Sequence, residues 1–396
     1  MMNAKTFVLI AFFLLWAGTV SQAQSTSLFT DAFTEDTAPW TNLGGSTIGI
    51  THQAADLPPN AKGALVFNYT VNPQKQEANS AQPFQVLIRP VKQGALASLQ
   101  AIRFQAYSDI GSPFICALSE HQGGRYLQVF WLPPKTWQQI TLYPKDFWLS
   151  DNKGDPPDPD GKLDLDQVEA IGIVPVSTIL SAFMGTDPQI VGILQPSSGQ
   201  HTFRLADFEA LSNGVPPPSD PQLPDDEKGV WIDPLNQDSI HWLLIGSQEM
   251  QYDPHPPFPG RALTVHYQQG PDRLILLLHD LHRVAMGNTD RIVFQAAAEK
   301  GVRLAVSLQM KDGARYFQIV DIPGDSKPTT VSVNIAAMQP APDSQEALSH
   351  PIDTNQLTTL ILADISFLFG QPEQHNTIWI GPVRAVQQTI GPKTSK

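Results

Sequence analysis

Two strand-like segments carry tyrosine, glutamine and arginine at alternate positions, and these residue types can bind sugars. Side chains of a strand alternate between its two faces. With the apolar positions of residues 101–107 and 125–131 placed in a core, one outward face carries Arg103, Gln105, Tyr107, Tyr126 and Gln128, and a related segment adds Tyr316 and Gln318. Aromatic rings stack on sugar C–H groups, while amide and guanidinium groups hydrogen-bond the hydroxyls. We therefore predict a carbohydrate-binding sheet face; the alternative is that these are ordinary solvent-facing strand positions.

Metal-binding patterns in the sequence are incomplete. The acid-rich segment 151–164 has the composition of an EF-hand calcium loop. When the EF-hand template is aligned with Asp158 and Asp160, however, Pro156 stands at position 1 and Gln167 at position 12, so the first ligand and the bidentate Glu are missing and we expect a solvated turn. His279 and His282 are an odd number of positions apart. On a strand they would point to opposite faces, which makes a poor metal pair.

The sequence also lacks the common catalytic signatures. It contains no G-x-S-x-G turn, no H-E-x-x-H helix and no phosphate-binding glycine loop, so we predict that the protein is not an enzyme. Glycoside hydrolysis stays open as a third hypothesis, because two carboxylates distant in sequence can meet in space. Cys116 is the one cysteine, and Val306 stands at the matching place of a repeat described below, which favours a role in the core.

The segments with this chemistry belong to a long internal repeat. Residues 123–130 (GGRYLQVF) return as residues 313–320 (GARYFQIV), an offset of 190. Two further pairs match at nearly the same offset: 101–106 with 291–296, and 163–168 with 352–357. A period of this size is a complete globular unit and not the repeat of a solenoid. The chain therefore contains two copies of one domain.

Each copy alternates apolar and polar residues with a period of two, between turns rich in Gly, Pro, Asn and Asp. This pattern predicts an all-β fold of two tandem β-sandwich (jelly-roll) domains joined by a Pro-rich linker. The expected boundaries are a signal peptide at 1–23, the first domain at 24–212, the linker at 213–228, the second domain at 229–390 and a tail at 391–396.

Composition and the first residues restrict the cellular setting. The chain of 396 residues has a net charge of −13 and only 16% charged residues, which disfavours nucleic acid as a partner. Lys5, the apolar run 7–19 and the small residues Ser21 and Ala23 form a signal-peptide pattern. The apolar run is shorter than the roughly 20 residues that a membrane span needs. We expect an exported protein, periplasmic or extracellular, with no membrane span after cleavage.

The first copy resembles the galactose-binding-like jelly rolls, above all family 11 carbohydrate-binding modules and the complex I intermediate-associated protein domain. The resemblance is carried, in order, by the strand around Phe104, the Gly-Arg-Tyr strand, and the segments 136–142, 161–164 and 203–209. The second copy departs from the pattern, since it lacks a counterpart of Trp137. The resemblance implies a carbohydrate ligand and a structural Ca²⁺ held by Asp31 and Asp207 in the first domain. No other cofactor is required.

Two kinds of partner follow from these observations. A polysaccharide or other glycan is the leading hypothesis, with Tyr316 and Gln318 as a second and weaker site. The alternative is a protein of the cell envelope, because the resemblance to the complex I intermediate-associated domain implies protein binding or assembly.

Overall fold

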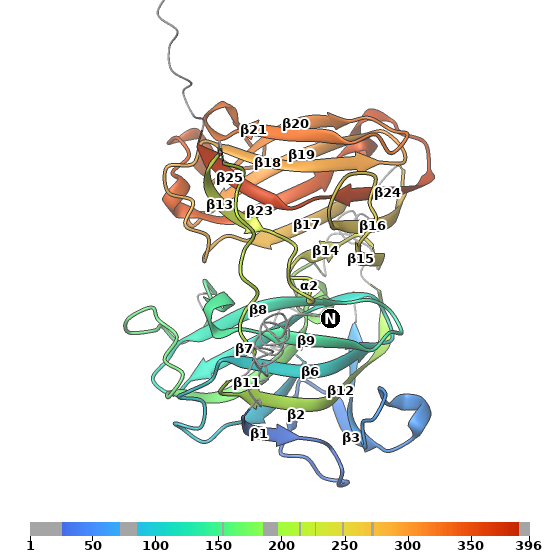
Figure 1. Cartoon of the computed structure of the whole chain (residues 1–396), viewed down its shortest axis with the longest axis vertical. Helices are drawn as coiled ribbons and strands as arrows, with labels where there is room; N and C mark the ends of the chain where they lie inside the picture. The colour runs from blue at the N-terminus through green and yellow to red at the C-terminus, as the bar shows by residue number, and fades with distance from the viewer. Residues whose placement is uncertain are drawn as a thin grey trace, which may run out of the picture.

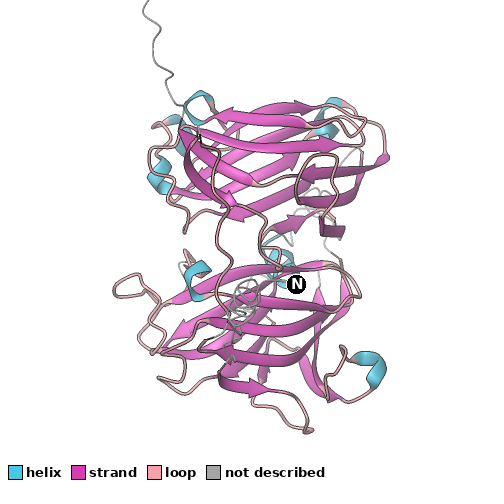
Figure 2. Ribbon diagram, in the orientation of Figure 1, coloured by secondary structure: helices cyan, strands magenta, loops and turns pink. Residues whose placement is uncertain are grey.

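The computed structural model describes residues 26–71, 85–152, 154–184, 197–213, 215–225, 227–247, 249–270 and 273–387. Two β-sandwiches lie one above the other along the long axis of the molecule, the first coloured blue to green and the second yellow to red (Figure 1). Strands are the predominant secondary structure of the described chain, and its helices are short (Figure 2). The predicted all-β, tandem jelly-roll architecture is confirmed.

The first sandwich consists of two six-stranded sheets. One sheet contains β3 (Thr47–Thr51), β4 (Ala64–Val71), β12 (Gly199–Leu211), β6 (Ala101–Ser108) and β9 (Gln138–Leu142), with β1 (Ser27–Asp31) paired to β12. The other contains β10 (Trp148–Leu149), β8 (Arg125–Leu132), β7 (Ser112–Glu120), β11 (Val168–Pro175), β5 (Val86–Pro90) and β2 (Thr41–Leu43). The helices are η1 (Ala54–Asp56), η2 (Pro144–Asp146) and α2 (Val176–Met184).

The second sandwich repeats this plan. Its seven-stranded sheet contains β13 (Lys228–Asp233), β25 (Val383–Gln387), β18 (Arg291–Ala298), β24 (Gln374–Ile380), β16 (Ala262–Gln269) and β15 (Glu249–Asp253), with β21 (Thr329–Asn334) paired to β18. Its six-stranded sheet contains β14 (Leu243–Ile245), β17 (Ile275–Asp280), β23 (Leu357–Asp364), β19 (Val302–Met310), β20 (Arg315–Ile322) and β22 (Gln339–Pro340). The short helices are η3 (Ile335–Ala337), η4 (Glu346–Leu348), η5 (Thr354–Gln356) and η6 (Ser366–Phe369).

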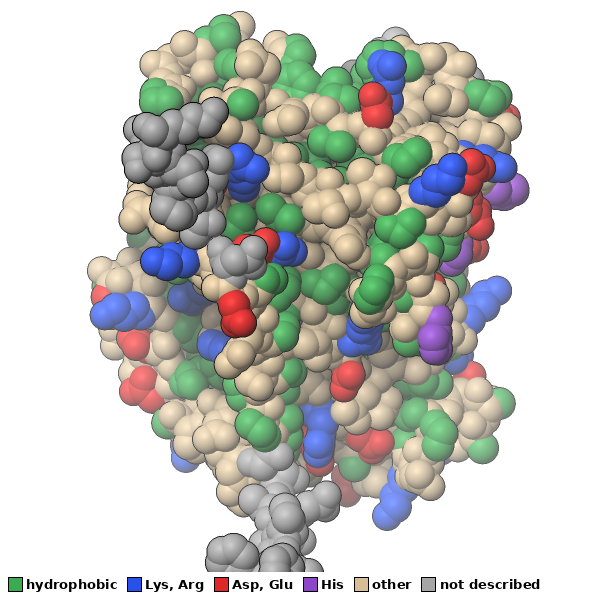
Figure 3. Space-filling view, turned by 45° about the horizontal axis from the view of Figure 1, so that its top comes forward, with side chains coloured by type: hydrophobic (Ala, Val, Ile, Leu, Met, Phe, Trp, Pro, Cys, Tyr) green, Lys and Arg blue, Asp and Glu red, His purple; other side chains and the backbone are tan. Residues whose placement is uncertain are grey.

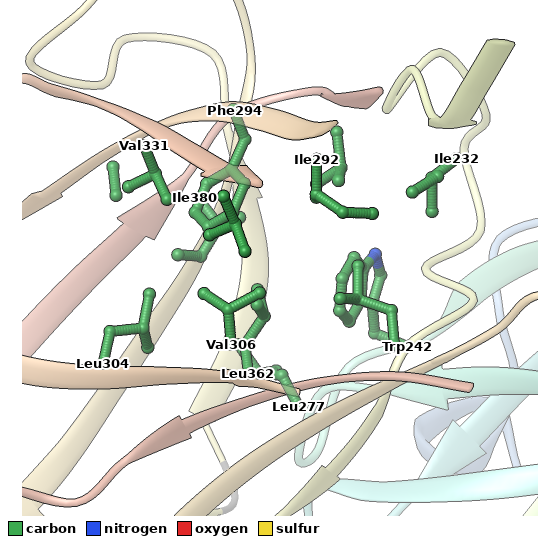
Figure 4. Close-up of a cluster of buried hydrophobic side chains, with 14 of the residues drawn as sticks. Ile232, Trp242, Leu277, Ile292, Phe294, Leu304, Val306, Val331, Leu362 and Ile380 are labelled. Atoms are coloured by element: carbon green, nitrogen blue, oxygen red, sulfur yellow. The ribbon is translucent and has the colours of Figure 1, made fainter. Parts of the chain in front are cut away.

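Each sandwich has its own apolar core between its sheets. Ile102, Phe104 and Cys116 are buried in the first core, as the alternation predicts. In the second core, Leu304 and Val306 of β19 face Phe294 and Ile380 of the opposite sheet (Figure 4), and all of these side chains are buried.

Strand β8 has the opposite pleat to the one expected from its sequence. Tyr126 and Gln128 point inward and are 0% and 1% exposed, while Leu127 and Val129 lie on the other face. Both faces of β8 carry buried side chains, Tyr126 on one and Val129 and Trp131 on the other. For such a strand an apolar alternation cannot identify the inner face, and an error of one residue in phase exchanges the two faces.

The two sandwiches are in direct contact. Trp131, at the end of β8, packs into the core of the second sandwich, and its backbone N–H donates to the Ile240 carbonyl at 2.9 Å. The Thr141 N–H donates to Ser239 Oγ at 3.2 Å. Trp231 Nε1 donates to the Pro221 carbonyl at 2.7 Å, which fixes the Pro-rich segment against β13. The linker is therefore packed against the domains and is not a free spacer.

The predicted signal peptide and tail lie outside the described residues. Within the described part of the chain, no helix has both the length and the apolar character needed to cross a membrane. On the face of the molecule shown in Figure 3, acidic and basic side chains are interspersed among many polar ones.

Candidate functional site: a polar cleft between the two sandwiches

The sequence-predicted carbohydrate-binding residues do not form one exposed face. Arg103, Gln105 and Tyr107 do point outward from β6, as predicted, and are half-buried. Tyr126 and Gln128, however, lie on the inner face of β8, which belongs to the opposite sheet of the same sandwich. The prediction that these five side chains share one face is wrong.

The outward side chains of β6 are already engaged by neighbours. Arg103 forms a salt bridge with Glu209 at 2.7 Å. The Tyr107 ring contacts the Arg204 guanidinium, 4.8 Å from its centroid, and the Trp137 ring, whose centroid is 5.7 Å away. A ring covered in this way offers little surface for stacking on a sugar.

The corresponding residues of the second copy are also turned inward. Tyr316 is 3% exposed and donates its hydroxyl to the His350 carbonyl, while Gln318 is half-buried with its Oε1 in the interior. Tyr126 likewise donates its hydroxyl to Asp158. These tyrosines tie their strands to neighbouring loops, so the prediction of an exposed second site at Tyr316 is wrong for the same reason of strand phase.

The two acids proposed to hold calcium have different surroundings. Asp31 accepts hydrogen bonds from Trp40 Nε1 at 2.9 Å and from Arg89 Nε at 3.0 Å. Asp207 has a positive φ of 47° at an irregularity of β12, and burial, together with Glu209, raises its pKa. Within the described residues, no group of three or more His, Cys, Asp or Glu side chains is arranged to hold a metal ion. Calcium at Asp31 and Asp207 stays a prediction.

The Asp31–Trp40 pair has a counterpart in the second copy. Trp242 Nε1 donates to Asp233 Oδ2 at 2.6 Å, over the same sequence separation of nine. The residue two positions after each Asp, Phe33 and Leu235, has a positive φ close to 50°. Each sandwich therefore begins with the same Asp–Trp lock between its entry strand and the following loop.

The two locks differ in their third member. The pairing of β5 with β11 and of β17 with β23 places His279 of the second copy where the first copy has Arg89. Arg89 forms an ion pair with Asp31, whereas the His279 ring stacks on Trp242 at 4.7 Å and its Nε2 bonds the Ile232 carbonyl. The shorter His279 leaves Asp233 facing a cavity between the domains.

This cavity, the interdomain cleft, has a volume of about 610 Å³. The first sandwich contributes Gln128, Asp146 and Trp148; the second contributes Asp233, His241, Tyr252 and His279; and Asp220 and Leu223 of the linker border it. Its size lies within the range of small-molecule sites, which often form between domains.

Several residues that line the cleft carry buried polar side-chain atoms without a hydrogen-bond partner within the described chain. They are Oε1 and Nε2 of Gln128, Oδ2 of Asp146, Oε1 of Gln237, Nε2 of His241 and Nδ1 of His279. Buried polar atoms are nearly always hydrogen-bonded, and an unpaired one costs about 1–3 kcal/mol. Bound water or a polar ligand in the cavity would supply the missing hydrogen bonds.

Burial favours the neutral forms of two ionisable groups in the cleft. Burial lowers the pKa of His241 to about 4, despite the nearby Asp233, so its imidazole is neutral at neutral pH. Burial also raises the pKa of Asp146, against the opposing effect of Lys145. The Gln128 and Gln237 amides add uncharged donors and acceptors beside these two groups.

Contacts across one end of the cleft hold the sandwiches together. His282 bonds Asp280 of its own domain and, at 2.7 Å, Asp151 of the first sandwich. Its ring is parallel to that of Trp148, with centroids 6.4 Å apart, and Arg283 Nε donates to the Phe147 carbonyl at 2.6 Å. His279 and His282 thus make two different contacts, and the structure does not bring them together as a metal pair.

Sequence reasoning missed the cleft because its residues come from six separate segments. One signal was available: Asp31 and Trp40 recur as Asp233 and Trp242, but at an offset of 202 and not 190. That pair would have aligned the starts of the two domains and drawn attention to the residues around it.

The two tandem sandwiches define the class of fold, a pair of jelly rolls. No protein-family model and no curated protein matches the sequence. Among solved structures, the family 11 carbohydrate-binding module of the cellulosomal cellulase Lic26A-Cel5E of Clostridium thermocellum is 16% identical. The match covers 47% of this chain and 94% of that one, with a TM-score of 0.32.

A second similar structure is the N-terminal CBM22-1–CBM22-2 tandem domain from Paenibacillus barcinonensis Xyn10C. It is 10% identical over 92% of this chain and 98% of that one, with a TM-score of 0.28. A third is TmCBM61 in complex with β-1,4-galactotriose, 12% identical over 37% and 88% of the two chains, with a TM-score of 0.25. At these values the likeness carries no function to this chain.

Proposed function

We propose that this protein is a carbohydrate-binding protein that holds a short oligosaccharide in the interdomain cleft. The observation that carries the proposal is the Gln128 side chain, which is 1% exposed and has both amide atoms unpaired, in a residue that borders the cleft. An amide donates and accepts at once, and vicinal sugar hydroxyls do the same. A sugar would therefore pair both atoms.

The other walls of the cleft support a neutral, polar ligand. Neutral His241 and the Gln237 amide add donors and acceptors to those of Gln128. Trp148, Trp231 and Tyr252 supply aromatic surface of the kind that sugars contact. Burial disfavours the charged forms of His241 and Asp146, so these two groups interact best with an uncharged polar ligand.

The proposal includes export and a non-catalytic role. Export is supported by the signal-peptide pattern of the first residues. A non-catalytic role is supported by the missing catalytic signatures. Hydrolysis is tested by incubating the protein with each of the three oligosaccharides named below and then assaying for new reducing ends. The proposal predicts that none appear. If they do, Asp146, whose pKa is raised, is the first residue to substitute.

Isothermal titration calorimetry tests the binding itself. The probes are β-1,4-galactotriose, xylohexaose and a β-1,3-1,4-mixed-linked tetrasaccharide, each titrated into the full chain and into Gln128→Met. We expect one probe to bind the wild type and to lose most of its affinity for the variant, while Gln105→Met, on the outer face of β6, binds normally. Binding that Gln105→Met abolishes and Gln128→Met retains would contradict the proposal, as would no binding by any of the three.

A further inference from the structure

The outer face of the β7–β8–β11 sheet carries a second cavity, separate from the cleft. Strand register places Ala117 opposite both Leu127 and Gly172, and Gly172 opposite Ile88. This row of side chains across the sheet therefore has large residues at its two ends, Leu127 and Ile88, and small residues in the middle. This arrangement produces a groove of about 540 Å³ along β7 and β11, which we name the aliphatic groove.

The aliphatic groove has one apolar and one polar end. Beyond Ala117 and Gly172, one end is lined by Ile115, Val174 and Val86, with Ile179 of α2 at the rim. The other end is lined by Ser119, Arg125, Ser150, Asn152 and Asp155. The ligand that fits this pattern has an apolar body and a single polar end.

In the second sandwich, large side chains occupy the position that corresponds to the aliphatic groove. There Ser307 pairs with Phe317 and Ile361, and Ile361 pairs with Leu278. Ile361 thus stands where the first copy has Gly172. The groove formed by the small residues Ala117 and Gly172 is therefore specific to the first sandwich and does not follow from the fold alone.

The lining argues against a sugar or a peptide in this groove. None of its lining residues is aromatic, so a sugar has no ring on which to stack. The floor is the face of a sheet whose backbone groups are used in the β7–β8, β7–β11 and β5–β11 ladders. A peptide would find no main-chain partners there.

Arg125 identifies the polar end of the ligand. Its Nη1 donates to Asp155 Oδ1 at 2.5 Å, and Asp155 also accepts from Ser150 Oγ. A guanidinium group has five N–H donors, so one bond to Asp155 leaves others for an acceptor, and the Arg125 side chain is 41% exposed. A carboxylate matches that donor geometry best.

We propose that the aliphatic groove binds a medium-chain fatty acid, with its chain along Ala117 and Gly172 and its carboxylate at Arg125. Each methylene that enters the groove should raise the affinity about fourfold. Dodecanoate should therefore bind about 15-fold more tightly than decanoate, which is two methylenes shorter. This site is independent of the carbohydrate proposed for the interdomain cleft.

The test is calorimetric titration of dodecanoate and decanoate, below their micellar concentrations, into the full chain and three variants. Gly172→Val fills the floor; a methyl group added at Gly172 would meet Ala117 Cβ and Val86 Cγ1 at 3.6 Å, which is ordinary contact. Gly49→Val is the matched control, because it is also a strand glycine but faces open space on the other sheet. Arg125→Gln tests the carboxylate contact.

We expect Gly172→Val to weaken dodecanoate binding at least about tenfold, and Arg125→Gln to weaken it about tenfold while leaving dodecanol binding unchanged within about twofold. Gly49→Val and Gln128→Met should bind as the wild type does. Thermal melts establish that the variants fold, and Ala117→Val replaces Gly172→Val if the latter does not. No binding of dodecanoate by the wild type, undiminished binding by the floor variant, or loss of binding in Gln128→Met would overturn the proposal.

Discussion

Replacing Gln128 with methionine separates ligand binding from structural stability. The Gln128 side chain is 1% exposed, and neither its Oε1 nor its Nε2 has a partner within the described chain. Methionine has a similar length and shape but no amide, so the variant removes the unpaired polar atoms with little change in packing. If the amide exists for a ligand, the free protein should become more stable while ligand binding becomes weaker.

The magnitudes follow from the cost of an unpaired buried polar group, about 1–3 kcal/mol. Removing that cost should raise the free energy of unfolding of the free protein by about 1–2 kcal/mol, which raises the melting temperature by roughly 2–4 °C for each kcal/mol in a domain of this size. In the complex the same amide would be paired. Its loss should therefore weaken oligosaccharide binding by about 1–3 kcal/mol, or roughly 5- to 150-fold in Kd.

Differential scanning calorimetry and isothermal titration calorimetry on the same samples measure both effects. Gln105→Met is the control, because Gln105 is half-buried on the outer face of β6, and it should change the free energy of unfolding by less than about 0.5 kcal/mol. A Gln128→Met protein that is clearly less stable than the wild type, and that keeps its affinity for the oligosaccharide, would refute the reasoning. That result would mean that the Gln128 amide has a structural role and does not bind a ligand.

Three further predictions concern stability. Burial alone would lower the pKa of His282, but the neighbouring Asp280 and Asp151 carboxylates outweigh burial, and the net effect is a raised pKa. The stabilisation that this provides is present at low pH and lost as pH rises through the raised pKa. The melting temperature should therefore fall less between about pH 5.5 and 8 in His282→Gln than in the wild type. Burial, with Asp158 and Asp164, raises the pKa of Glu120 from 4.5 to about 7; folding therefore takes up a proton between these values, stability decreases as pH rises across them, and Glu120→Gln should remove this decrease. Trp242→Phe deprives buried Asp233 of a donor and should lower the free energy of unfolding by about 1–3 kcal/mol in urea titrations; an unchanged midpoint would show that the Asp–Trp lock is not stabilising.

The sequence was sufficient for the duplication and for the class of fold. Repeated blocks and period-two alternation predict two all-β sandwiches, because a strand that is apolar on one face alone must turn that face inward. This reasoning works for β6, where Ile102 and Phe104 are buried and Arg103 points outward.

The same reasoning fails for β8 because that strand carries apolar residues on both faces. Leu127 faces the aliphatic groove and Trp131 enters the second core, so apolar residues occur on both sides. Tyr126 faces inward because its ring joins the first core and its hydroxyl reaches Asp158 at the edge. No local pattern distinguishes this arrangement from the opposite phase.

The cleft could not be predicted, because it depends on how the two domains pack. Gln128, Asp146 and His241 are brought together by contacts such as Trp131 N–H to the Ile240 carbonyl, between residues more than a hundred positions apart. What the sequence could have shown is that His279 replaces Arg89 beside a repeated Asp–Trp pair. At that position the second copy lacks the ion pair that Arg89 forms with Asp31 in the first copy.

The most direct test of the interdomain cleft is an NMR titration of the full chain with the oligosaccharide that binds in calorimetry. The Gln128 side-chain amide, the His241 ring and the Trp148 indole should show the largest chemical shift changes, with intermolecular NOEs from the Gln128 amide protons to the sugar. Shift changes confined to Arg103, Gln105 and Tyr107, on the outer face of β6, would contradict the account.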